Sequence, residues 1–108
     1  MDLNFQETNK YLWLILNEKL TADNSENLLH IVREKISQSP QNLAVDMRNQ
    51  TELDPIATST LITVQKEMVL ANRELLLVNP QESLLAQLAG SGMDSLFNIC
   101  HNSSDVPD

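Results

Sequence analysis

The feature that most constrains the fold is an alternation of short apolar runs with longer segments of helical period. Two of the runs, Leu43–Met47 and Leu75–Val78, are each followed by a helix start that contains a proline. Runs this short suit buried strands, since helices in compact domains need about 10 residues or more. Strands that are joined through helices lie parallel, with right-handed crossovers that cover the sheet. The chain is therefore predicted to be an α/β protein.

The chain opens with a different pattern, in which two strand-like segments follow each other almost directly. Leu3–Thr8 and Tyr11–Leu16 are separated only by Asn9 and Lys10, a polar pair that suits a tight hairpin. The first two strands are therefore expected to be antiparallel, with the first at an edge. A short final strand is expected near Leu96–Ile99. Together these segments predict a mixed sheet of four to five strands with helices packed on it.

Two helix starts carry strong local signals. Asp54 can accept a hydrogen bond from a free amide of the first turn, and Pro55 lacks only an amide proton that would have no partner there. A helix is expected from this point to about residue 72, and capping is a simpler role for Asp54 than catalysis. Asn79 and Pro80 repeat the pattern, so a third helix is expected there, with its left-handed stop at Gly90.

The first helix and the end of the chain are marked by weaker signals. Asp23 and Glu26 have the spacing of a capping box, and apolar residues then recur at helical intervals, which predicts a helix over about residues 24–38. The last residues, 101–108, are mostly polar and have little to bury. A chain of this length holds one ordinary domain. We expect a single domain over residues 1–100 and a flexible tail over 101–108.

The charge balance excludes several classes of partner. Fifteen Asp and Glu against seven Lys and Arg give a net charge of -8, and no basic cluster offsets it locally. Nucleic acids and anionic membrane surfaces bind proteins through Lys and Arg, so neither is an expected partner. The apolar runs, such as Leu12–Leu16, are too short for insertion into a membrane.

Two single residues bear on compartment and surface. Cys100 is the only cysteine, which excludes an internal disulfide and a pair of thiolate metal ligands and favours a reducing cytoplasm. It is interpreted as a small core residue rather than a reactive thiol. Trp13 must face the side of the sheet opposite to its neighbours in the strand. Core packing is the favoured interpretation of Trp13, and an exposed contact for a partner stays open.

No residues match a common catalytic or cofactor-binding motif. Phosphate-binding and nucleophile motifs are absent, and the chain has only two glycines. His30 and His101 lack the spacing of a metal pair, and neither has an evident nucleophile. We therefore expect no catalytic activity, no cofactor and no metal centre. Only a weak cation site at Asp46, Glu52 and Asp54 is left open.

Three segments carry a resemblance to a known family. Leu16–Ala22 is similar to a strand and turn of the form L-x-G-x-L-D-A, and Leu43–Ala57 is similar to a strand followed by a D-S-S-G or D-S-T-G switch. Leu75–Phe97 is close to a strand, helix and closing L-x-x-x-G-L-x-x-L-F. These segments resemble the STAS domain, the family of bacterial anti-sigma factor antagonists and of the regulatory tails of sulfate transporters, over residues 3–99. The resemblance implies the STAS α/β fold.

The switch segment departs from the family pattern. Asp54 is kept, but Pro55–Ala57 stands in place of Ser, the phospho-acceptor Ser or Thr, and Gly. Ile56 has no hydroxyl, so no phosphorylation is expected at the family position. Thr58 and Ser59 are weak substitute candidates, although small polar residues in a first helical turn often only pack against the sheet.

The resemblance also implies a function. It suggests a non-catalytic regulator that binds an anti-sigma factor or a serine kinase-like partner through Asp54–Ser59 and the adjoining loop 48–53. The alternative is a STAS subunit of a lipid-transport ABC complex or another multiprotein assembly, and a homodimer stays open. A phospho-accepting receiver domain is disfavoured, because no acidic pair follows the first strand.

Overall fold

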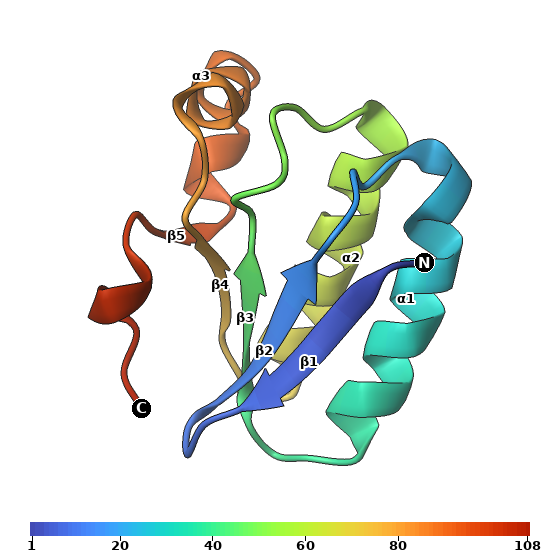
Figure 1. Ribbon diagram of the computed structural model, residues 1–108, viewed down its shortest axis with the longest axis vertical. Helices are drawn as coiled ribbons and strands as arrows, with labels where there is room; N and C mark the ends of the chain where they lie inside the picture. The colour runs from blue at the N-terminus through green and yellow to red at the C-terminus, as the bar shows by residue number, and fades with distance from the viewer.

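The computed structural model describes residues 1–108 and contains one five-stranded sheet in the order β1-β2-β3-β4-β5 (Figure 1). β1 is antiparallel to β2, and the remaining neighbours are parallel. This confirms the predicted mixed α/β sheet with its first strand at an edge. The strands are β1 (Leu3–Glu7), β2 (Tyr11–Leu16), β3 (Asn42–Asp46), β4 (Leu75–Val78) and β5 (Asn98–Cys100).

Three helices accompany the sheet: α1 (Ala22–Ser37), α2 (Pro55–Leu70) and α3 (Glu82–Gly90). Figure 1 shows α1 and α2 side by side on one face of the sheet and α3 beyond the carboxyl ends of the strands. The main buried cluster joins all three helices to this face and also includes Phe97. No helix is long and apolar enough to cross a membrane.

The two faces of the sheet follow from alternation along the strands. In β2, Leu12 and Leu14 join the main cluster under the helices, whereas Tyr11 and Trp13 point to the other side. We call that second side the helix-free face. It carries a small buried cluster of Tyr11, Ala44, Leu76 and Val78. Trp13 packs against this cluster and is only partly buried, so it lies outside the main core.

The first helix begins earlier than the sequence indicated. Its N-cap is Thr21, whose amide donates to Oδ1 of Asn24 at 2.8 Å. The expected capping box of Asp23 and Glu26 was wrong, since both side chains are exposed within the helix. A distant contact accompanies this early start. The side chain of Gln50 accepts the amide of Leu20, and the helix begins two residues later.

The third helix begins later than expected. Its N-cap is Gln81, whereas Asn79 adopts a left-handed conformation with φ of 57°. The prediction of a cap at Asn79 was wrong, because its side chain is engaged with Ser103. The left-handed stop was also misplaced. Gly90 is the last helical residue, and Gly92 has the positive φ of 74°.

The end of the chain runs beside β4 and β5, on the side away from α1 and α2 (Figure 1). The final strand begins at Asn98, two residues later than expected, because Leu96 ends a short 3-10 turn and Phe97 enters the core. A second 3-10 turn spans Ser103–Asp105, and Val106 packs against the small cluster. The flexibility of residues 101–108 stays a prediction.

Candidate functional site

Asp54 joins the starts of two helices. Its Oδ1 accepts the amide of Ala57 at 2.8 Å, which confirms the predicted cap of α2. Its Oδ2 accepts the amide of Ala22, the first residue of α1, also at 2.8 Å. A carboxylate placed between two helix N-termini is favoured by the partial positive charge of both. Each oxygen of Asp54 therefore has a backbone donor, and its role here is to position α1 against α2.

Two glutamines tie the surrounding loops together. Gln50 is fully buried, with Oε1 accepting the amide of Leu20 and Nε2 donating to the carbonyl of Glu18, both at 2.8 Å. Gln87 of α3 forms the same kind of bridge to Leu53, at 2.9 Å to its amide and 2.5 Å to its carbonyl. Neither bridge could be predicted from the sequence, since the partners lie at least 30 residues away and no motif marks them. The loops before α1 and α2 are thus held in one arrangement.

The segment Asp54–Ser59 forms the start of α2 and follows directly after Leu53, which Gln87 binds. Ile56 is 56% exposed and is the one large apolar side chain at this helix start that faces solvent, beside the exposed Pro55. Ala57 is fully buried and supports the surface from beneath. The hydroxyl of Thr58 donates to the backbone carbonyl of the capping aspartate at 3.0 Å, while Ser59 is exposed. The residues that face solvent here are therefore apolar or small.

A hollow of about 340 Å³ adjoins this segment between α2 and α3. Leu53, Ile62 and Met93 form its apolar lining together with Pro55, and polar side chains of both helices complete it. Charged side chains lie around the same end of the molecule, with Glu52 two residues before the cap, Glu82 in the first turn of α3 and Lys19 beside Glu52. The combined surface offers an apolar contact with more acidic than basic side chains around it.

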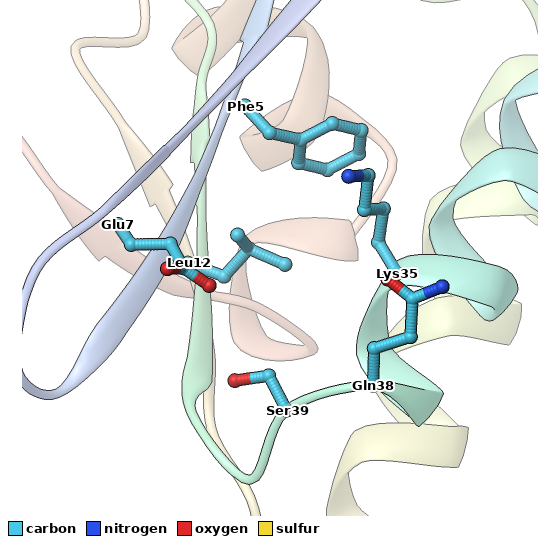
Figure 2. Close-up of a pocket in the computed structure, with 6 residues that line it drawn as sticks. All are labelled: Phe5, Glu7, Leu12, Lys35, Gln38 and Ser39. Carbon is cyan, nitrogen blue, oxygen red and sulfur yellow. The ribbon is translucent and has the colours of Figure 1, made fainter.

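The largest hollow, about 480 Å³, lies elsewhere, between the β1–β2 hairpin and the last turn of α1 (Figure 2). Phe5 and Leu12 line it together with polar side chains. The ammonium group of Lys35 lies 5.4 Å from the centre of the Phe5 ring and is attracted by its face. None of the residues singled out in the sequence lines this hollow.

The remaining chemical candidates are separated in the structure. Asp46 is buried on the helix-free face and forms an ion pair with Nε of Arg48 at 2.9 Å. The structure thus gives Asp46 and Asp54 separate partners, and no group of three or more His, Cys, Asp or Glu could hold a metal ion. His30 and His101 are exposed. Cys100 is half-buried at the edge of the small cluster rather than in the main core.

The sequence was compared with known protein families. Residues 2–106 match the STAS domain. The chain belongs to the STAS domain family. STAS domains of the anti-sigma factor antagonist type are generally non-catalytic regulators. No significant sequence match was found among curated proteins.

Solved structures of low sequence identity share the fold of this STAS domain. A candidate anti-sigma factor antagonist from Thermotoga maritima, TM1081, has a TM-score of 0.87 at 14% identity, over 95% of this chain and 89% of that one. A serine-to-glutamate variant of RsbS from Moorella thermoacetica has a TM-score of 0.80 at 15% identity, over 96% and 90%. The unphosphorylated form of the anti-sigma factor antagonist SpoIIAA has 0.74 at 13%, over 92% and 88%.

Proposed function

We propose that this STAS domain is a non-catalytic regulator that binds an anti-sigma factor or a serine kinase-like protein through the start of α2. The observation that carries the proposal is the exposed side chain of Ile56 on a surface held by Asp54, Gln50 and Gln87. The proposal involves no catalytic step, cofactor or metal, and it places the protein in the cytoplasm.

A surface of this kind is suited to a specific protein contact. Binding costs free energy when loops must be ordered, and here the loops before α1 and α2 are already bridged. A large side chain at the centre of a contact contributes most when it enters a pocket of the partner, as Ile56 would. The carboxylates around it, Glu52 among them, favour a partner with cationic side chains at the rim.

The absence of a hydroxyl on Ile56 implies a constant state. In the family, phosphate at this position adds about -1.5 to -2 charge, which would disturb an apolar contact. With isoleucine there, the switch by phosphorylation is lost and the unphosphorylated, binding-competent form persists. Ser59 is the better-exposed substitute acceptor, since the hydroxyl of Thr58 is engaged by the backbone.

The direct test replaces Ile56 with a charged residue. Ile56→Asp should weaken binding of the purified partner about 5- to 150-fold, because a carboxylate would be buried in an apolar contact. Leu70→Asp is the matched control, since Leu70 is 87% exposed at the other end of the same helix. Equal affinity of wild type and Ile56→Asp, measured by calorimetry, would show that α2 does not dock by its start.

A second experiment tests the lost switch. The wild type and Ile56→Ser are incubated with ATP and the serine kinase-like protein that copurifies with the wild type, and phosphate is mapped by mass spectrometry. We expect no phosphate on the wild type and modification of the introduced serine. Stoichiometric phosphate on Ser59 or Thr58 of the wild type, with loss of partner binding, would show that the switch has moved.

The second candidate function is a subunit of a lipid-transport ABC complex or another stable assembly. The exposed Ile56 favours it, because a permanent apolar contact requires no phosphate-controlled release. Affinity purification of the tagged protein at its natural level distinguishes the two. Membrane transporter components in stoichiometric amount favour the assembly, whereas an anti-sigma factor or kinase favours the regulator.

A further inference from the structure

The C-terminal segment covers part of the helix-free face with few contacts. Three hydrogen bonds join the side chain of Asn79 to Ser103: two to its hydroxyl, at 3.1 and 3.3 Å, and one from its amide, at 3.1 Å. Val106 then packs against the cluster that contains Leu76 and Val78. Beyond these contacts the segment is held mainly by bonds within itself, such as Asn102 to Ser104.

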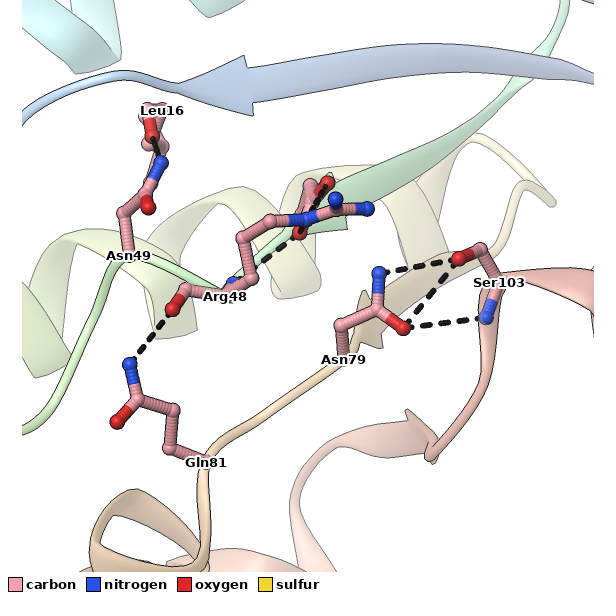
Figure 3. Close-up of polar contacts among 7 residues, drawn as sticks. Leu16, Arg48, Asn49, Asn79, Gln81 and Ser103 are labelled. Atoms are coloured by element: carbon pink, nitrogen blue, oxygen red, sulfur yellow. Dashed lines mark hydrogen bonds and ion pairs between the residues drawn. The ribbon is translucent and has the colours of Figure 1, made fainter.

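The clamp on this segment depends on an uncommon backbone conformation. Asn79 has a φ of 57°, which costs energy for residues other than glycine, although asparagine tolerates it best. This conformation directly follows the end of β4 and aims the side chain at Ser103 (Figure 3). A glycine would adopt the same backbone without strain but would have no side chain to bind the segment.

The same region is connected to the loop before α2. Two residues after Asn79, Nε2 of Gln81 donates to the carbonyl of Arg48 at 2.6 Å. The amide of Arg48 and its Nε both donate to Asp46 at the end of β3 (Figure 3). Arg48 begins the loop that reaches the cap of α2, so the residue that binds the C-terminal segment and the residue that contacts this loop are only two positions apart in the chain.

We propose that residues 101–108 form a reversible strap over the helix-free face. When docked, the strap covers Leu76 and Val78 and, through Asn79 and Gln81, holds the loop 48–53 in place. When released, it exposes those side chains and loosens the loop. Segments with few buried contacts open locally at low free energy, which fits a strap held by one clamp and one valine. The strap itself does not depend on the function proposed above. Only its consequence for a partner that docks at the loop 48–53 rests on that function.

The test compares two identical substitutions at the two asparagines with positive φ. Asn79→Gly removes the clamp and keeps the backbone, and Asn72→Gly is the control, since Asn72 has a φ of 58° after the end of α2. Hydrogen exchange is measured by NMR on the isolated protein, without a partner. In Asn79→Gly the amides of Ser103 and Val106 should exchange about tenfold faster, and that of Arg48 should also accelerate. The control should leave all three unchanged.

A second pair of variants guards against a general effect on folding. Ser103→Ala removes the hydroxyl that Asn79 binds, whereas the hydroxyl of Ser104 reaches only Asn102. Ser103→Ala should therefore repeat the acceleration in weaker form, and Ser104→Ala should not. Unchanged exchange at Val106 in Asn79→Gly would overturn the strap. Faster exchange in the strap without any change at Arg48 would overturn its connection to the loop.

Discussion

The two faces of the sheet differ sharply in what covers them. One face lies under α1 and α2 and belongs to a cluster of 19 buried residues, while the helix-free face buries four, against which Trp13, Cys100 and Val106 pack. Neighbouring residues of one strand thus belong to different clusters, with Leu77 in the main cluster and Leu76 in the small one. Most of the buried apolar area therefore lies on the helix-covered face, and the helix-free face can lose its cover at a smaller cost in stability.

The largest effect should come from the helix-covered face. Leu77 of β4 is fully buried in the main cluster. Leu77→Ala should lower the free energy of unfolding by about 3–5 kcal/mol, because packed helices cannot collapse fully into the cavity. Urea denaturation followed by circular dichroism measures this loss. A loss below 1 kcal/mol would contradict the assignment of Leu77 to the core.

Leu76, the adjacent residue, lies on the helix-free face and should be less costly to replace than Leu77. Leu76 is 9% exposed and its cover is a short segment rather than a helix. Leu76→Ala should cost about 1–2 kcal/mol, since the segment can move and the site can admit water, so the cavity penalty is small. The same urea experiment applies. Equal losses of unfolding free energy for Leu76→Ala and Leu77→Ala would show that the C-terminal segment packs as firmly as the helices.

Trp13 should have a smaller effect. It is partly buried beside the small cluster. Trp13→Phe keeps an aromatic ring there and should change the free energy of unfolding by about 1 kcal/mol or less. Thermal unfolding in paired samples checks this value. A loss of unfolding free energy as large as that of Leu77→Ala would show that Trp13 packs as firmly as a residue of the main cluster.

The smallest effect at neutral pH concerns Tyr11. Burial, followed by its 3.0 Å hydrogen bond to Glu74, raises the pKa of Tyr11 from 10.0 to about 12. Since the folded pKa is raised, the neutral phenol stabilises the fold fully below pH 10, and this contribution is lost as pH rises through 12. It is the only tyrosine, so its absorbance titrates it directly.

A matched variant isolates the cause of that shift. Glu74→Gln removes the charge that disfavours tyrosinate, so the pKa of Tyr11 should fall towards 10 without reaching it, because burial remains. Tyr11→Phe should remove the corresponding loss of stability between pH 10 and 12. A wild-type midpoint near 10 would show that the helix-free face is open to water around the phenol.

Local signals were read correctly at the start of α2. Asp54 binds the amide of Ala57, three residues away, and Pro55 follows it, so the whole motif lies within one turn. At the start of α3 the same signals misled, because Asn79 is taken by Ser103, 24 residues away. A cap can be predicted only while no distant partner competes for the side chain.

The candidate surface divides in the same way. The order of strands and helices, the antiparallel opening and the missing hydroxyl of Ile56 could all be read from the order of residues, because each depends on neighbours along the chain. The bridges of Gln50 and Gln87, the second bond of Asp54 and the path of the C-terminal segment were decided by tertiary structure. An amide or carboxylate can bind any free backbone group within reach, and only packing determines which one is near.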